Sequence, residues 1–202
     1  MTAPTAFASF EEETTMLDDR TGLAVEIFDP RGVVDTDSRP LAARKPALAG
    51  LRLGILDNSK WNANKLLRGA AAALSDQIEL GAVNYYVKTH GFSTDAPAEM
   101  IRQIAAENDI VLTAIGDCGS CCSCCIRDAI ALEGLGLPTA PIITTEFVNE
   151  TRLTRTAVGM PELKPVVIDH PVSSITAEEV AARVEVIATQ AQEVWLGTRA
   201  DI

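Results

Sequence analysis

From Leu51 onward, the sequence alternates between short apolar runs and longer segments with helical periodicity. The run Ile110–Ile115 is rich in β-branched residues, whereas Asn62–Leu74 repeats Ala and Leu on one helical face. Strands that are separated by helices pair in parallel through right-handed crossovers. The alternation therefore predicts an α/β fold, with an open, doubly wound parallel sheet of about five strands in a flavodoxin-like order.

The expected strands are short, and a polar loop follows each of them. They are Leu51–Leu56, Val83–Val87, Ile110–Ile115, Pro141–Thr145 and Pro165–Ile168. The expected helices are Asn62–Leu74, Pro97–Glu107, a helix from Cys118 or Ser120 to Leu135, Glu146–Val158 and Thr176–Gly197. Thr176 and Glu179 form a capping box, which predicts where the last helix begins.

Residues 1–48 lack this alternation and contain the acidic run Glu11–Glu13 and the turn formers Asp29–Gly32. A short strand is expected at Leu23–Phe28. We interpret residues 1–48 as a partly extended N-terminal arm that wraps the catalytic domain, residues 49–202, or a neighbouring subunit. Disorder of this segment is the alternative. A long arm beside a small core favours a homo-oligomer or an enzyme complex.

Charge and hydropathy exclude several classes of protein. The net charge is -11 and the basic residues are scattered, so no nucleic-acid partner is expected. No apolar stretch approaches the roughly 18 residues that a membrane span needs, so no membrane partner is expected. The first ten residues lack the basic-then-apolar order of a secretory signal. We therefore expect a cytoplasmic protein.

All five cysteines lie between positions 118 and 125. Disulfide scaffolds spread their cysteines along the chain, because each bridge then closes a long loop. A cluster this tight cannot staple a fold in that way. It indicates local chemistry instead, which is redox, nucleophilic or metal-binding.

Ligands of open α/β sheets bind beyond the carboxyl ends of the strands. Unusual polar residues follow each of the five expected strands. In chain order they are Asn58, Ser59 and Lys60, then His90, then Asp117 and Cys118, then Thr145 and Glu146, then Asp169 and His170. We expect the side chains of Lys60, Cys118, Glu146 and His170 to line one pocket, whereas His90 is as well explained as a surface residue.

The five thiols cannot all share one task. At about 100° per residue, Cys118, Cys122 and Cys125 lie within roughly 60° of one another on a helix surface. Cys121 flanks them and Cys124 points away. We expect Cys124 and Cys125 to be buried as small apolar residues.

Cys118 has the most favourable position for reactivity. At a helix N-terminus its thiolate gains from the free amides and the helix dipole, although the charge of Asp117 opposes this. Cys118 and Cys121 form a CxxC pair at a helix start, the geometry that dithiol oxidoreductases use. Gly119 lets the backbone approach a substrate closely.

These residues resemble a known family. Gly116–Cys121, followed by Cys122-Ser123-Cys124, resembles the hallmark of the UGSC family of proteins and selenoproteins, and that of the selenoprotein B subunits of glycine, sarcosine and betaine reductases. Cys118 occupies the selenocysteine position of that motif, Cys121 its first cysteine and Cys124 its second. The likeness continues at Leu53–Lys60, Leu135–Pro138 and Asp169–Val172, and covers about residues 51–185.

The resemblance implies a nucleophilic or reducing thiol. In the reductases the selenol attacks an activated carbon, displaces an amine and leaves a carbon–selenium adduct. Carried over, Cys118 is the nucleophile, Cys121 the resolving thiol and His170 a candidate proton donor. Sulfur is less nucleophilic than selenium at neutral pH, Cys122 and Cys125 are extra, and Asp117 adds a negative charge, so the substrate is not carried over.

Three hypotheses follow. The first is a thiol-dependent reductase or lyase that acts on a small polar substrate, either neutral or anionic. It uses an external thiol or a thioredoxin-like reductant. Its candidate substrate-binding residues are Asn58, Ser59, Lys60, Gly119, Ser120, Thr145 and Glu146.

The second hypothesis is a metalloenzyme, in which Cys118, Cys121, Cys122 and Cys125, with His170, hold zinc, iron or an iron–sulfur cluster. Against it, tetrahedral sites usually draw ligand pairs from two separated segments, and these thiols are crowded into one. The third is a non-enzymatic redox sensor or metal-handling protein. Against it, such a protein does not need five polar loops at one edge of the sheet. No cofactor is firmly predicted.

Overall fold

The computed structural model describes residues 36–89 and 91–201. Its sheet contains five parallel strands in the order β2-β1-β3-β4-β5. The strands are β1 (Arg52–Asp57), β2 (Ala82–Val87), β3 (Ile110–Gly116), β4 (Thr139–Thr144) and β5 (Val166–Ile168). The predicted α/β fold and flavodoxin-like order are thus confirmed, and the order reverses between β1 and β3.

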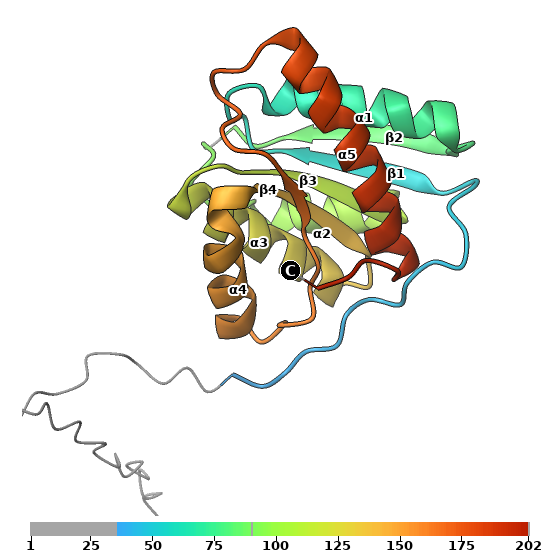
Figure 1. The fold of residues 1–202 in the computed structure, drawn as a ribbon. Coiled ribbons are helices and arrows are strands. Elements are labelled where there is room, and N and C mark those ends of the chain that lie inside the picture. The colour runs from blue at the N-terminus through green and yellow to red at the C-terminus, as the bar shows by residue number, and fades with distance from the viewer. Residues whose placement is uncertain (1–35, 90, 202) are drawn as a thin grey trace, which may run out of the picture. The chain divides into compact units, whose positions relative to one another are not determined.

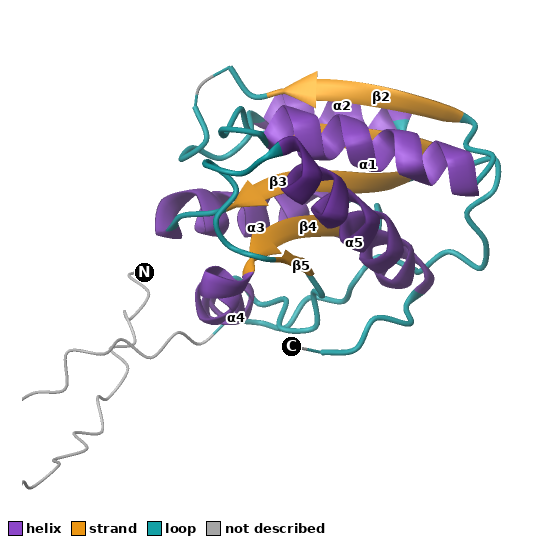
Figure 2. Ribbon diagram, turned by 45° about the horizontal axis from the view of Figure 1, so that its top comes forward, coloured by secondary structure: helices purple, strands orange, loops and turns teal. Residues whose placement is uncertain are grey.

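Helices cover both faces of this sheet (Figure 1). In both ribbon views, α1 (Ala63–Gln77) and α5 (Ala177–Leu196) lie on one face, and α2 (Ala98–Glu107) and α3 (Gly119–Gly134) lie on the other (Figure 2). A further helix, α4 (Val148–Ala157), packs beside α3. Among the described residues, no helix is both long and apolar enough to cross a membrane.

The strands explain why the sheet is covered on both faces. Successive residues of a strand point to opposite faces, so Leu53 and Ile55 join one core cluster while Leu56 joins another. Every residue of β3 is buried, as expected for the central strand of a parallel sheet. The core is mainly aliphatic, and its largest member, Trp195 of α5, donates its indole N–H to the Val111 carbonyl at 3.0 Å.

Part of the predicted arm lies within the described residues. Its backbone is hydrogen-bonded to the rest of the domain at Arg39, Ala42 and Lys45, whose N–H groups reach Gly159 O, Glu133 Oε2 and Trp195 O. The predicted strand Leu23–Phe28 lies outside the described residues. The boundary at residue 48 stays a prediction.

Several element boundaries were predicted wrongly. β4 begins at Thr139 rather than Pro141, because Thr139 already pairs with Val111 of β3. The helix expected from Glu146 begins at Val148, after a 3-10 turn at Thr145–Phe147. The capping box of α5 is confirmed: Thr176 Oγ1 accepts from Glu179 N at 3.2 Å, and Glu179 Oε2 accepts from Thr176 N at 2.7 Å.

Candidate active site

The start of α3 places two thiols in direct contact. Cys118 is the extended N-cap residue between β3 and α3, and its Sγ lies 2.7 Å from Sγ of Cys121. Cys121 Sγ also accepts the backbone N–H groups of Asp117 and Cys118, at 3.3 and 3.0 Å. The first turn of the helix holds no acidic residue. Negative charge on Cys121 would therefore be stabilised by two backbone N–H groups, and charge on Cys118 by the N-terminus of the helix.

The two thiols of the pair differ in acidity. Burial acts to raise the pKa of Cys118, but hydrogen bonds with Cys121 and Ser120 and the charge of Lys60 outweigh it, so the pKa lies below its ordinary value. Deeper burial and the hydrogen bond with Cys118 raise the pKa of Cys121 to about 12. Cys118 is partly exposed and Cys121 is fully buried. The pair thus combines an accessible thiol that ionises more readily than usual with a buried thiol that ionises less readily.

The other three thiols are buried and face different neighbours. Cys122 Sγ lies 3.2 Å from Thr151 Oγ1, Cys124 Sγ accepts from an Arg127 N–H group at 3.3 Å, and Cys125 Sγ lies against backbone carbonyls of β3 and β4. Burial raises the pKa of Cys122 to about 11 and also raises the pKa of Cys124 and of Cys125. Cys124 and Cys125 are each 2% exposed, which confirms their predicted burial.

The proposed metal ligands do not converge on one point. Cys118 and Cys121 contact each other, whereas Cys122 turns toward α4 and Cys125 turns toward the sheet. In the part of the chain that the structure describes, no group of three or more His, Cys, Asp or Glu side chains is arranged to hold a metal ion. The geometry therefore gives the four-thiol metal site no support.

His170 lies at the same edge of the sheet as the thiol pair, beside Asp117. Its Nδ1 is 2.9 Å from Asp117 Oδ1 and 3.1 Å from Thr144 Oγ1, and its backbone N–H donates to Thr145 Oγ1 at 3.3 Å. The Asp117 side chain is 4% exposed and that of His170 is 33% exposed. Asp117 Oδ1 is buried and has no hydrogen-bond partner among the described residues, so the contact with His170 compensates this oxygen only when the imidazole is protonated.

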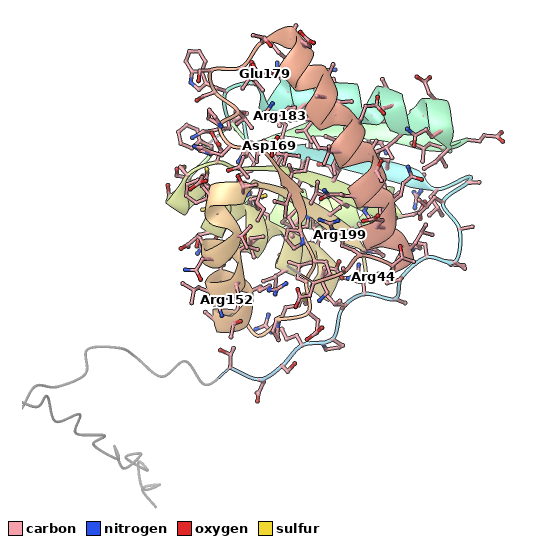
Figure 3. All side chains as sticks on the ribbon, in the orientation of Figure 1. Arg44, Arg152, Asp169, Glu179, Arg183 and Arg199 are labelled. Atoms are coloured by element: carbon pink, nitrogen blue, oxygen red, sulfur yellow. The ribbon has the colours of Figure 1, made fainter. Side chains whose placement is uncertain are left out.

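Arg183, which the sequence analysis did not single out, holds the loop that carries His170. Figure 3 shows Arg183 on α5 beside Asp169. Its guanidinium donates to the carbonyls of Asp169 at 3.1 Å, Glu179 at 3.1 Å and Pro171 at 3.5 Å. Arg183 is 9% exposed. A buried, fixed guanidinium of this kind limits the movement of the His170 loop.

In the loop after β1, two polar residues stabilise the backbone, whereas a third has its side chain at the surface. Asn58 is buried, donates to Ile115 O at 3.1 Å and accepts from Lys60 N at 3.3 Å. Ser59 donates its hydroxyl to Lys88 O at 2.9 Å. Asn58 and Ser59 therefore shape the loop. The Lys60 side chain remains at the surface, with Nζ 4.7 Å from the centre of the Phe92 ring.

A pocket of about 420 Å³ opens beside this loop. Its lining includes Lys60 but not Cys118, Glu146 or His170, so it does not support the predicted pocket of all four residues. Sequence analysis missed most of this lining; the available signal was a Trp directly after Lys60, within a polar segment. The lining residues are Asp57, Ser59, Lys60, Trp61, Asn62, Asn64, Arg68, Tyr85 and Val87.

The remaining candidate residues are dispersed around the thiol pair. A Cβ at Gly119 would meet nothing within 4 Å, so the backbone there is open to approach. Ser120 Oγ lies 3.0 Å from Ser93 Oγ and 3.8 Å from Cys118 Sγ. Thr145 supports the His170 backbone, and Glu146 is exposed. His90 lies outside the described residues.

Comparisons with known proteins identify the family. A family model described as the UGSC family matches residues 26–197, which is most of the chain. No curated protein and no solved structure matched the chain in these comparisons. The matched segment contains the Cys118 to Cys121 motif and the whole parallel sheet. The chain belongs to the UGSC family.

Proposed function

We propose that this protein is a thiol-dependent reductase or lyase that acts on a small polar substrate, with Cys118 as nucleophile and Cys121 as resolving thiol. One observation carries the proposal: a partly exposed thiol of lowered pKa contacts a buried, protonated thiol at a helix N-terminus. Dithiol enzymes need this asymmetry, because one sulfur must attack as thiolate while the other waits as thiol.

In the first step, the Cys118 thiolate attacks a carbon that lies next to a carbonyl group and bears a leaving group. A carbon–sulfur bond forms, the bond to the leaving group breaks, and the leaving group departs with the electron pair. His170 supplies a proton to it. The hydrogen bond between His170 Nδ1 and Thr144 Oγ1, together with the contact to Asp117, supports this role, because it orients the ring and leaves Nε2 for the substrate.

In the second step, Cys121 loses its proton and attacks Cys118 Sγ. A disulfide forms, the carbon–sulfur bond breaks, and the electron pair passes to the carbon, where the adjacent carbonyl stabilises it until a proton is taken up. The product carbon has gained two electrons, and the two thiols have lost them. An external dithiol then reduces the disulfide by exchange and restores both thiols.

The proposal is tested by mass spectrometry of Cys121→Ser protein isolated from cells. A serine in place of Cys121 cannot attack the adduct, so a carbon adduct is expected to accumulate on the Cys118 peptide. Cys118→Ser protein is the first control and should carry no adduct. Cys124→Ser is the matched control, because it removes a buried thiol of the same helix, and it should be as free of adduct as the unmodified sequence.

A redox sensor would give a different result. It would show the Cys118–Cys121 disulfide after exposure to oxidant but no carbon adduct in any variant. Cys121→Ser protein that never carries an adduct, even when its Cys118 remains reactive, contradicts the proposed reaction.

A further inference from the structure

The pocket beside Lys60 is cationic. Lys60 and Arg68 both line it, and neither forms an ion pair with a carboxylate within 4 Å among the residues that the structure describes. Both instead lie over aromatic rings: Lys60 Nζ is 4.7 Å from the Phe92 centroid, and Arg68 Cζ is 4.4 Å from the Tyr85 centroid. No ion pair with a described residue therefore neutralises either of these two cations, although the net charge of the protein is -11.

The carboxylate in the pocket wall is already engaged. Asp57 is 3% exposed, and its Oδ2 accepts the Tyr85 hydroxyl at 2.6 Å while its Oδ1 accepts Ser59 N at 2.7 Å. These bonds fix the Tyr85 ring and the start of the loop. Burial is the largest cause that raises the pKa of Tyr85, followed by its hydrogen bond to Asp57, so the hydroxyl stays a neutral donor. The exposed part of the wall therefore carries positive charge.

The pocket also presents a flat apolar surface. Trp61 lines it and is 73% exposed, more than any other large hydrophobic residue among those described. An exposed indole beside a cavity provides a stacking surface for a ligand, since burial of a Trp side chain is strongly favourable. Two amides complete the lining: Asn64, and Asn62, whose Nδ2 already donates to Val172 O at 2.8 Å.

We propose that this pocket binds an organic anion with a small aromatic body, its acidic group held by Lys60 and Arg68 and its ring against Trp61, and that this anion is the substrate of the thiol chemistry. The second part of this proposal, that the bound anion is the substrate, rests on the function proposed above. A volume of about 420 Å³ suits a small molecule rather than a macromolecule. Printed contacts aside from charge connect the two places: Lys60 lies over the Phe92 ring, and the next residue, Ser93, contacts Ser120 at 3.0 Å. Ser120 Oγ in turn lies 3.8 Å from Cys118 Sγ.

Binding is tested on Cys118→Ser protein, so that no reaction interferes. The probe is 4-nitrobenzoate, a ring that quenches Trp fluorescence, and its neutral match is 4-nitrobenzamide. Of the two Trp residues, Trp195 is fully buried, so quenching reports Trp61. We expect saturable quenching by the anion, at least about tenfold weaker binding of the amide, and loss of the signal in Trp61→Phe.

Charge variants then test the two cations. Lys60→Gln and Arg68→Gln should each weaken 4-nitrobenzoate binding by about tenfold. Lys65→Gln is the matched control, because Lys65 is an exposed lysine of α1 outside the pocket lining, and it should bind as before. Equal binding of anion and amide, or equal loss in all three variants, overturns the proposal. 4-Nitrophenyl phosphate distinguishes a site for carboxylates from a site for phosphates. If it binds more tightly than 4-nitrobenzoate, the site is assigned to phosphate esters.

The link to the thiols is tested separately on the unmodified sequence. Saturating 4-nitrobenzoate should slow alkylation of Cys118 by iodoacetamide severalfold. Anion binding without protection overturns the assignment of the pocket as the substrate site of Cys118. A reactive Cys118 in a protein that binds no anion overturns the pocket proposal and leaves the proposed thiol function standing.

Discussion

The first turn of α3 and the body of the same helix contain the same functional group in different surroundings. Cys121 Sγ accepts the backbone N–H groups of Asp117 and Cys118 at the edge of the sheet, and Cys118 is partly open to solvent. The thiols in the body are at most 2% exposed and meet hydroxyls, carbonyls and one guanidinium. Position relative to the helix end, and not residue type, thus determines which sulfur can carry chemistry.

The body of α3 also contains the polar contacts that hold the domain together. Asp128 accepts from Lys88 Nζ and from Ala96 N, each at 2.7 Å, and the Lys88 and Asp128 side chains are 1% and 3% exposed. Farther along, Glu133 accepts from Arg44 and from the backbone of Ala42 and Thr139. We therefore expect changes in the first turn to affect reactivity and changes in the body to affect stability.

The largest expected effect is that of Cys118→Ser on reactivity. A serine hydroxyl stays protonated without a base beside it, so the rate of the fast reaction with the disulfide reagent DTNB should fall by at least about 10,000-fold. The unmodified sequence should release two thionitrobenzoate ions per chain as Cys121 resolves the mixed disulfide. Cys121→Ser should release one and stay trapped. Fast release of two ions from Cys118→Ser would show that another thiol attacks.

Asp128→Ala should have the largest effect on stability. It leaves the buried Lys88 amine without its ion-pair partner, and the free energy of unfolding should fall by about 3–5 kcal/mol. Urea denaturation followed by circular dichroism measures it. Glu99→Ala is the control, since its ion pair with Arg102 is exposed and should contribute less than about 1 kcal/mol. Equal effects of the two substitutions would contradict a structural role for the body of α3.

Cys124→Ala should lower stability without changing reactivity, and it thereby distinguishes the body of α3 from the first turn within the cysteine cluster. Cys124 is buried, so its truncation should lower the free energy of unfolding by about 1–2 kcal/mol. The rate and the stoichiometry of the DTNB reaction should not change. A slower DTNB reaction at unchanged stability would instead give Cys124 a chemical role.

Cys121→Ala should alter the pH dependence of Cys118. Burial acts to raise the pKa of Cys118, and the hydrogen bonds with Cys121 are the main effect that lowers it. Alkylation requires thiolate, so the rate rises with pH through the Cys118 pKa. Removing the Cys121 side chain should move the midpoint to higher pH and slow alkylation at pH 7 severalfold. Cys125→Ala should leave the midpoint in place.

Lys60→Gln should give the smallest shift in the same measurement. The charge of Lys60 comes after the hydrogen bonds among the causes that lower the Cys118 pKa. The midpoint should therefore move upward by less than in Cys121→Ala. Lys65→Gln is the charge-matched control and should not move it. A larger shift for Lys60→Gln than for Cys121→Ala would mean that charge, and not hydrogen bonding, sets the acidity of Cys118.

The sequence pattern was sufficient for the sheet and for the position of the thiol pair, because both depend on local periodicity and on the residues directly after a strand. It was not sufficient for contacts between distant segments. Asp117 was weighed only as a repelling charge, whereas the fold brings His170, from the end of another strand, to within 2.9 Å of it. Arg183 and the Arg68–Tyr85 stack likewise join separate elements, and nothing in their local sequence marks them.

The central claim is that the first turn of α3 makes Cys118 the reactive thiol of the five. The most direct measurement is the alkylation rate of each cysteine in the folded protein as a function of pH, with peptide mass spectrometry to assign each site. We expect Cys118 to react first, with a midpoint below the ordinary thiol pKa, and the thiols in the body to react only on unfolding. Alkylation of Cys121, Cys122, Cys124 or Cys125 as fast as that of Cys118 would contradict the claim.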